Sequence, residues 1–192
     1  MKYIKLIPFI LTLGLFAIAC KTEMVEKLDD FALDQGGYMR IVTPFPKAGE
    51  SFNTIFKVSK ANMAGTKAEM VNEAVTLEKG GRFANYDLEI RFNGGTAATT
   101  TAYKAFRSIP ASSYAKDPTT GYPRHTLTIT GAEAMTAMAL DTSKIKAKDK
   151  FEFRATMKLT DGKAFNATNT GVNITGGAFY SSPFFYTLNV VD

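Results

Sequence analysis

The side chains that could carry catalysis in this chain are few, and their spacing matches no catalytic motif. His125 is the only histidine and Cys20 the only cysteine among 192 residues. A zinc site or a serine hydrolase needs further partners, and neither a second histidine nor a G-x-S-x-G elbow is present. His125 is two residues before Leu127 and four before Ile129, so all three should point to the inward side of a predicted strand. We therefore expect His125 to be structural. The sequence therefore predicts no catalytic residue, no metal ligand and no cofactor.

Carboxylates offer the one remaining route to catalysis. The two acids that hydrolyse a glycosidic bond meet in the fold rather than in the sequence, so a hydrolase whose acids converge only in the fold stays open as an alternative. However, most acids occupy the polar positions of predicted strands or a polar N-terminal segment. Asp87, Glu89 and Glu152 are examples, and we expect all three to be solvated.

Tyrosines are the better candidates for binding. The chain contains 15 Phe and 8 Tyr but no Trp. A tyrosine has a flat apolar face and a polar tip, which suits stacking on a sugar ring or anchoring a partner protein. We select Tyr103, Tyr114 and Tyr122, in or near a predicted long loop, and Tyr180, which precedes the last strand. Tyr114 and Tyr122 lie among Ser, Lys, Asp, Pro and Gly and are expected to be the most exposed. The alternative is that these rings pack at the ends of the fold.

The first residues have the character of an export leader. Lys2 and Lys5 flank the start of an apolar stretch from Leu6 to Ala19. A spanning helix needs about 20 apolar residues, so this stretch fits a signal-peptide core better than an anchor. Ala17-Ile18-Ala19-Cys20 is similar to the bacterial lipobox, in which the cysteine receives a lipid. Residues 1–19 are therefore predicted to be a signal peptide and Cys20 a lipidated N-terminus that holds the chain to membrane lipid. The alternative is an ordinary signal peptide whose cleavage leaves an unpaired cysteine, which is unusual in a secreted protein.

The remaining charge is small. Without Lys2 and Lys5 the chain has 21 basic and 18 acidic side chains, and no stretch gathers the Lys and Arg that a nucleic-acid surface requires. We therefore expect no nucleic-acid partner. Residues 20–36 are polar and of mixed charge, which is typical of a tether between lipid and domain.

From Gly37 onward the apolar side chains mostly follow a period of two, which indicates half-buried strands. The clearest examples are Tyr86–Phe92 and Phe151–Leu159, and Asp161-Gly162 follows as a hairpin turn. Prolines 110, 118 and 123 bracket a predicted long loop. Weaker patterns predict further strands at Tyr38–Thr43, Phe52–Lys60, Ala74–Glu78, His125–Thr130, Val172–Thr175 and Phe184–Val191.

One segment has a helical pattern instead. Thr130 and Glu133 have the spacing of a capping box, and they predict a short helix over Gly131–Leu140 that crosses between two sheets. Many short strands, no βαβ alternation and one crossover helix favour an all-β fold. We predict an immunoglobulin-like antiparallel β-sandwich over residues 37–192, a single domain.

Five short stretches of the chain carry a family resemblance: Gly36–Val42, Ser108–Ala111, Gly121–Arg124, Leu159–Lys163 and Phe179–Phe184. They resemble a family of small Bacteroidetes outer-membrane surface lipoproteins encoded near SusC/SusD-type nutrient-uptake systems. The likeness covers roughly Gly36 to Val191. It implies a non-catalytic domain on the cell surface that accompanies an importer, and it brings no ligand residues with it.

Three functions remain open from the sequence. The first is a non-enzymatic surface lipoprotein that acts as a binding or accessory subunit for polysaccharide or nutrient capture. The second is a structural or assembly subunit that docks on an outer-membrane barrel, such as a SusC/SusD-type complex. The third is the hydrolase described above. All three place the protein at the outer membrane through the lipid on Cys20.

Overall fold

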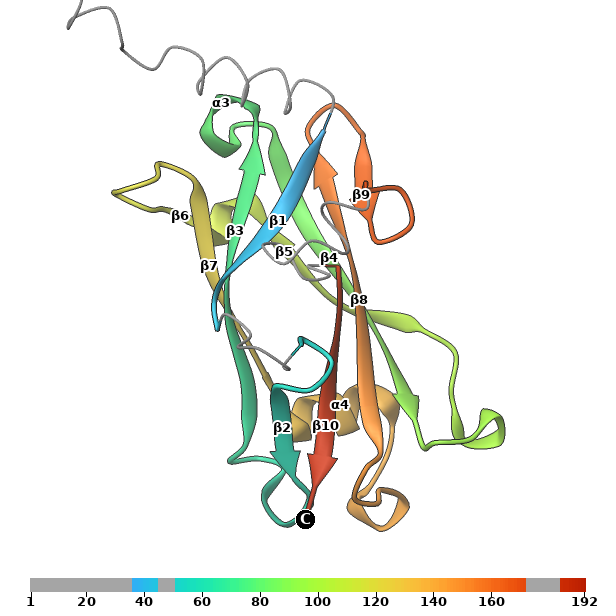
Figure 1. Cartoon of the computed structure of the whole chain (residues 1–192). Coiled ribbons are helices and arrows are strands. Elements are labelled where there is room, and N and C mark those ends of the chain that lie inside the picture. The colour runs from blue at the N-terminus through green and yellow to red at the C-terminus, as the bar shows by residue number, and fades with distance from the viewer. Residues whose placement is uncertain (1–35, 45–50, 172–183) are drawn as a thin grey trace, which may run out of the picture. The chain divides into compact units, whose positions relative to one another are not determined.

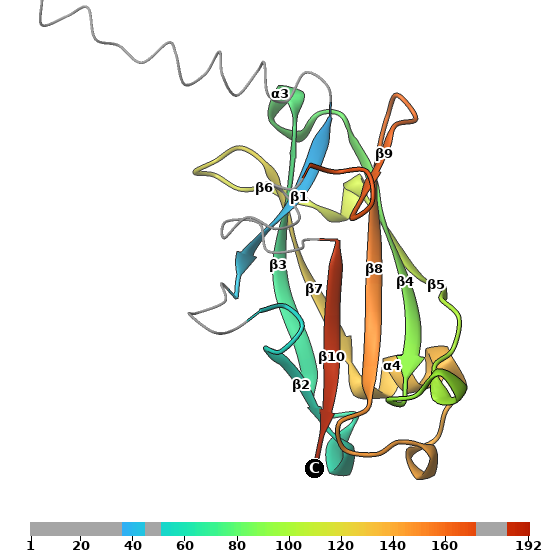
Figure 2. The same ribbon diagram turned by 45° about the vertical axis from the view of Figure 1, so that its right-hand side comes forward.

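Two β-sheets pack face to face in the computed structural model, which describes residues 36–44, 51–171 and 184–192 (Figures 1 and 2). We name them sheet A and sheet B. In spatial order, sheet A contains β1 (Gly37–Thr43), β3 (Lys67–Thr76), β7 (Pro123–Thr130) and β6 (Ala115–Lys116). Sheet B contains β2 (Phe56–Ser59), β10 (Phe185–Val191), β8 (Lys150–Leu159), β4 (Phe83–Asn93) and β5 (Lys104–Pro110), and β9 (Ala164–Asn166) pairs with β8.

The strand order confirms the predicted immunoglobulin-like sandwich. The order β1-β3-β7-β6 corresponds to the A-B-E-D sheet of that fold, and β10-β8-β4-β5 corresponds to its G-F-C sheet with the added C′ strand. One pair departs from the antiparallel expectation, because β2 runs parallel to β10. β1 and β2 follow each other in the chain but belong to opposite sheets, so the two together occupy the place of a single divided first strand.

The core lies between the sheets and is built by the alternation that the sequence shows. Leu88 and Ile90 on β4 face Met70 and Leu127 from sheet A, and all four are almost completely buried. Phe153 on β8 is 1% exposed. Residues Gly36–Asp192 form one compact unit. Within the described residues, no helix has the length and apolar character needed to cross a membrane.

Helix α4 (Gly131–Met138) carries the chain from β7 in sheet A to β8 in sheet B, as predicted. The Thr130 hydroxyl accepts a hydrogen bond from the Glu133 N–H at 3.1 Å, and the Glu133 carboxylate accepts one from the Thr130 N–H at 2.9 Å. The capping box is therefore formed. The other helical segments are short: α3 (Leu77–Gly80), η1 (Lys60–Asn62), η2 (Ala97–Thr99), η3 (Ala111–Ser113) and η4 (Thr142–Lys144).

Two strand predictions were wrong in their limits. β3 ends at Thr76, because the chain then turns through Glu78 and Lys79 with φ of 59° and 51° instead of continuing as a strand. Gly80 completes this turn with φ of 82°, and a Cβ there would lie 2.2 Å from Cδ of Pro123. The strand predicted at Phe52–Lys60 begins only at Phe56. The strand predicted at Val172–Thr175 lies outside the described residues.

The predicted long loop between Pro110 and Pro123 contains the two-residue strand β6, and β5, which ends at Pro110, was not predicted as a strand. A β-bulge interrupts the period-two pattern of β5. Leu88 pairs with Arg107 and Glu89 pairs with Ala105, so Phe106 has no partner on β4. The Phe106 ring then packs 5.5 Å from the ring of Phe153, while Arg107 donates to the Thr128 carbonyl at 3.0 Å. Two consecutive side chains thus point toward the interior, which hides the strand from a simple alternation test.

Candidate functional site

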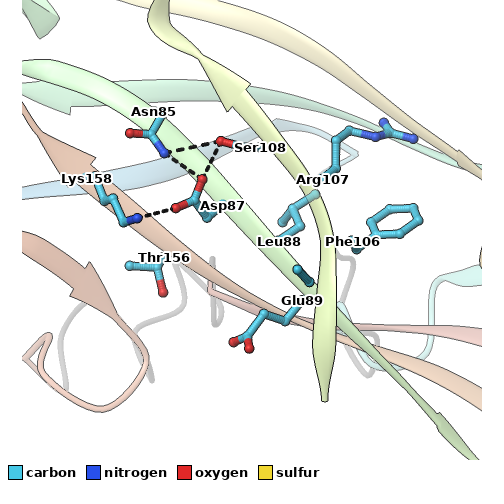
Figure 3. A pocket seen from close by; sticks show the side chains of 10 residues that line it. Asn85, Asp87, Leu88, Glu89, Phe106, Arg107, Ser108, Thr156 and Lys158 are labelled. Atoms are coloured by element: carbon cyan, nitrogen blue, oxygen red, sulfur yellow. Dashed lines mark hydrogen bonds and ion pairs between the residues drawn. The ribbon is translucent and has the colours of Figure 1, made fainter. Parts of the chain in front are cut away.

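A groove of about 590 Å³ lies on the outer face of sheet B, across β4, β5 and β8 (Figure 3). Its polar side chains occupy the strand positions that alternate with core residues, so the same pattern that builds the core directs them to solvent. The volume is within the range of small-molecule sites. We call it the sheet B groove; its polar lining residues are Asn85, Asp87, Glu89, Arg107, Ser108, Thr156 and Lys158.

Asp87 is the central acceptor of the sheet B groove (Figure 3). It accepts hydrogen bonds from the Asn85 amide at 2.5 Å and the Ser108 hydroxyl at 2.6 Å, and Nζ of Lys158 lies 2.7 Å from its other oxygen. Partial burial alone would raise the pKa of Asp87, but these hydrogen bonds and the Lys158 charge outweigh it and hold the pKa below its ordinary value. Asp87 is therefore ionised at neutral pH.

Two further ion pairs continue from the groove along β4 and β8. Glu89 faces Arg154 across the sheet and binds it with both oxygens, at 2.6 and 3.1 Å. The hydrogen bond to Glu89 is the main reason that the pKa of Arg154 is raised. Arg91 also faces Glu152 across the sheet and binds one of its oxygens at 2.5 Å. Together with Asp87 and Lys158 they form a row of three ion pairs, which we call the ion-pair row.

Glu152 corrects one sequence expectation. It lies on the outer face, as its position in the strand predicts, but it is only 7% exposed and is not a solvated residue. Arg91 covers one oxygen and the Asn93 amide donates to the other at 2.7 Å. Long neighbouring side chains can bury an outward-facing group in this way, which strand alternation cannot reveal.

Tyr103 lies at the end of the ion-pair row. It immediately precedes β5, and its ring centre is 4.6 Å from the guanidinium carbon of Arg91 and 4.3 Å from that of Arg154. Such cation–π contacts fix the orientation of a ring that is only half-buried. Burial raises the pKa of Tyr103, so its hydroxyl stays protonated and can both donate and accept a hydrogen bond.

The other predicted tyrosines do not join Tyr103. The expectation that Tyr114 is exposed is wrong: it is 8% exposed, and its ring packs 4.7 Å from the ring of Phe83 and 5.1 Å from that of His125. The tight turn formed by η3 before it directs the ring into the core. Tyr122 is half-buried on the sheet A side, with Nζ of Lys79 5.4 Å from its ring centre. Tyr180 lies outside the described residues.

His125 has the surroundings of a structural histidine. Its Nδ1 is 3.0 Å from the Ser113 carbonyl oxygen, and its ring contacts Tyr114. Within residues 36–44, 51–171 and 184–192, no group of three His, Cys, Asp or Glu side chains could hold a metal ion. Cys20 and the leader lie outside the described residues.

A second charged cluster, which the sequence did not reveal, lies on the outer face of sheet A. Glu73 is completely buried there, although its position alternates with core residues and its side chain points outward. Arg40 donates to one carboxylate oxygen, and Arg124 at 2.6 Å and Thr120 at 2.9 Å donate to the other. Arg124 also pairs with Asp117 at 2.5 Å. We call these residues the Glu73 cluster.

Comparisons with known proteins do not name either surface. No protein-family model matches the chain, and no curated protein matches its sequence.

Proposed function

We propose that this chain is a non-enzymatic, lipid-anchored protein of the outer membrane that faces the cell surface and binds polysaccharide for nutrient capture. The observation that carries the proposal is the sheet B groove together with the half-buried ring of Tyr103 near it. The two are linked by Arg154, which pairs with Glu89 of the groove and contacts the Tyr103 ring.

This surface has the two kinds of groups that a sugar ring needs. A sugar has apolar C–H faces and a rim of hydroxyl groups, so it is recognised by an aromatic face together with hydrogen-bonding side chains. Tyr103 supplies the aromatic face. Asn85, Ser108 and Thr156 supply neutral donors and acceptors in the adjoining groove. Because the cation–π contacts with Arg91 and Arg154 already hold the tyrosine ring in place, little side-chain freedom is lost on binding.

The state of the acids supports a binding role over hydrolysis. A glycosidase acid must carry a proton near neutral pH, and this requires a raised pKa. In the groove, Asp87 has a lowered pKa, while Glu89 is held by both its oxygens on Arg154. Both carboxylates therefore act as fixed acceptors that orient their neighbours.

The lipid anchor is supported by the leader and by Cys20 at the predicted cleavage site. Cys20→Ser should abolish incorporation of radiolabelled fatty acid and release the protein from membranes, because the lipid would supply most of its membrane affinity. The measurement is fractionation of cells that express the wild type or the variant. Normal processing with the variant still retained in membranes would refute the lipidation.

Binding is tested by affinity electrophoresis through gels that contain one of a panel of soluble polysaccharides. We expect Tyr103→Ala to remove the retardation while lowering the melting temperature by no more than about 2–4 °C, since an exposed cation–π contact is weak. Tyr122→Ala is the matched control, because it removes a half-buried tyrosine from the β6–β7 connection on the sheet A side, and it should be retarded like the wild type.

Wild-type protein that no polysaccharide retards would overturn the binding proposal, and so would equal retardation of the wild type and Tyr103→Ala. If the unretarded wild type instead co-purified with a barrel protein from detergent-solubilised outer membrane, the assembly-subunit alternative would replace it.

A further inference from the structure

We infer that the ligand of the sheet B groove is an uncharged oligosaccharide chain, bound lengthwise along β4 and β8. This inference rests on the proposed function and names the ligand class of the same site. It comes from the way in which the charged side chains of this face are paired.

Every charged side chain that lines the groove already has a partner of opposite charge. Asp87 is paired with Lys158 at 2.7 Å, and Glu89 with Arg154 at 2.6 Å. Arg107, at the edge of the groove, is paired with Glu133 of α4 at 3.1 Å. The lining therefore offers neither a free cation to an acidic sugar nor a free carboxylate to a basic one.

A charged ligand would have to break one of these pairs in order to bind. Its gain would be offset by the lost pair and by repulsion from the released carboxylate or cation, so the paired surface discriminates against it. The pairs are stable over a wide pH range, because the pKa of Asp87 is lowered and that of Arg154 is raised. Neither group changes its charge near neutral pH.

A sugar hydroxyl has no such conflict. It can donate to a carboxylate oxygen that retains a free lone pair or to the Ser108 hydroxyl oxygen, and it can accept from the Thr156 hydroxyl. These roles leave the ion pairs and the hydrogen bond from Ser108 to Asp87 intact. The Asn85 amide, which already donates to Asp87, still presents its carbonyl oxygen as an acceptor. The groove thus offers neutral hydrogen-bonding groups to a ligand, while its charged side chains remain paired with one another.

The length of the surface favours a chain over a single sugar. Asp87, Glu89 and Arg91 are alternate residues of β4, so each step of the ion-pair row is roughly 6.6 Å and the two steps together span roughly 13 Å. Tyr103 lies at the Arg91 end, while Asn85 and Lys158 lie at the opposite end. A ligand that contacts Tyr103 and the groove at once must therefore contain several sugar units in a row.

The test is titration calorimetry of the full-length protein with matched hexasaccharides: cellohexaose, maltohexaose and mannohexaose as neutral probes, and hexagalacturonate as the acidic probe. Titrations are run at about 0.05 M and about 0.5 M NaCl, where screening differs strongly. We expect a neutral hexasaccharide to bind with an affinity that changes by less than about twofold with salt, and hexagalacturonate to bind about tenfold more weakly or not at all. The corresponding monosaccharide should also bind about tenfold more weakly than its hexasaccharide, since it reaches only part of the surface.

A charge-unbalancing variant sharpens the test. Glu89→Gln leaves Arg154 without its carboxylate, so it should gain salt-sensitive affinity for hexagalacturonate. Glu69→Gln is the control: it removes the same charge from an exposed ion pair with Lys67 on sheet A, and its affinities should equal those of the wild type.

The outcomes separate the two proposals. Hexagalacturonate that binds the wild type more tightly than every neutral probe, with affinity falling in salt, would overturn the inference and leave the binding proposal standing. Equal binding of mono- and hexasaccharide would overturn the extended, lengthwise site alone. Absence of binding by all probes, together with no retardation in any polysaccharide gel, would overturn both proposals.

Discussion

The outer faces of both sheets carry glutamate–arginine ion pairs, but the pairs of Glu73 and Glu89 differ in their exposure to solvent. On sheet A, Glu73 is bound by two arginines and its side chain is 0% exposed; on sheet B, Glu89 is bound by one arginine and its side chain is 38% exposed. A ligand can contact a buried ion pair only if the segment that covers the pair moves away, whereas it can contact an exposed ion pair directly. The amount of cover, more than the residue types, therefore separates a structural cluster from a candidate binding surface.

The cover on sheet A comes from the connection between β6 and β7. Asp117 accepts hydrogen bonds from the N–H groups of Thr119 and Thr120, which folds the connection into a turn, and Gly121 closes it with φ of 76°. The turn brings the Thr120 hydroxyl onto Glu73. On sheet B, all the described residues that line the groove belong to the strands β4, β5 and β8, and the side chains of its ion pairs stay partly exposed to solvent.

The largest effect on the free energy of unfolding is expected for Tyr114, the buried tyrosine that follows η3. Tyr114→Ala should lower the free energy of unfolding by about 3–5 kcal/mol, as deletion of a buried aromatic ring does. Tyr103→Ala should cost less than about 1 kcal/mol, because its ring is half-buried and held by exposed cation–π contacts. Urea denaturation of both variants measures the difference. Tyr114→Phe is the control and should be no less stable than the wild type, since the buried Tyr114 hydroxyl has no hydrogen-bond partner among the residues that the structure describes. Equal costs for the two alanine variants would mean that Tyr114 is not part of the core.

The next effect concerns the two glutamates. Glu73→Ala should destabilise the protein by about 3 kcal/mol, because it leaves the partly buried Arg40 and Arg124 without their shared carboxylate. Glu89→Ala removes a carboxylate from an exposed pair and should cost about 1 kcal/mol or less. The same denaturation series tests both. A Glu73→Ala variant as stable as Glu89→Ala would show that the cover over Glu73 opens easily, and the contrast between the faces would be lost.

The strands of the fold could be predicted from the sequence better than the arrangement of side chains on the outer faces of the sheets. Strands such as β4 and β8 are visible because a sheet that is buried on one side imposes alternation on its residues. β5 was missed because its bulge places Phe106 and Arg107 on the same side, which breaks the period. The end of β3 was missed because Glu78 and Lys79 adopt left-handed conformations that non-glycine residues rarely show.

The candidate site was predicted only in part. Tyr103 was selected for its residue type, but the arginines that hold it are distant in the sequence and meet it only through sheet register. The buried state of Glu73 had no sequence signal, because it depends on a turn more than forty residues away. Tyr114 was misplaced for a related reason: polar neighbours suggest exposure, while the single turn of η3 decides which way the ring points.

The smallest expected effect is the acid response of the sheet B groove. The pKa of Asp87 in the folded protein lies below its ordinary value of 3.8, so its hydrogen bonds with Asn85 and Ser108 and its pair with Lys158 contribute stability that is complete above that value. This contribution is lost as the pH falls through the folded pKa, because the unfolded chain binds the proton first. Asp87→Asn cannot lose it. The difference in the free energy of unfolding between the wild type and Asp87→Asn should therefore narrow as the pH is lowered from about 6 to about 2.

Asp117 on sheet A also has a lowered pKa, mainly through the hydrogen bond from the Thr120 N–H, so its carboxyl should titrate below 3.8 as well. A carboxyl ¹³C NMR titration measures both groups directly. An Asp87 midpoint above 3.8 together with an Asp117 midpoint below 3.8 would mean that the groove holds an acid with a raised pKa. That result would favour hydrolysis over binding at this face.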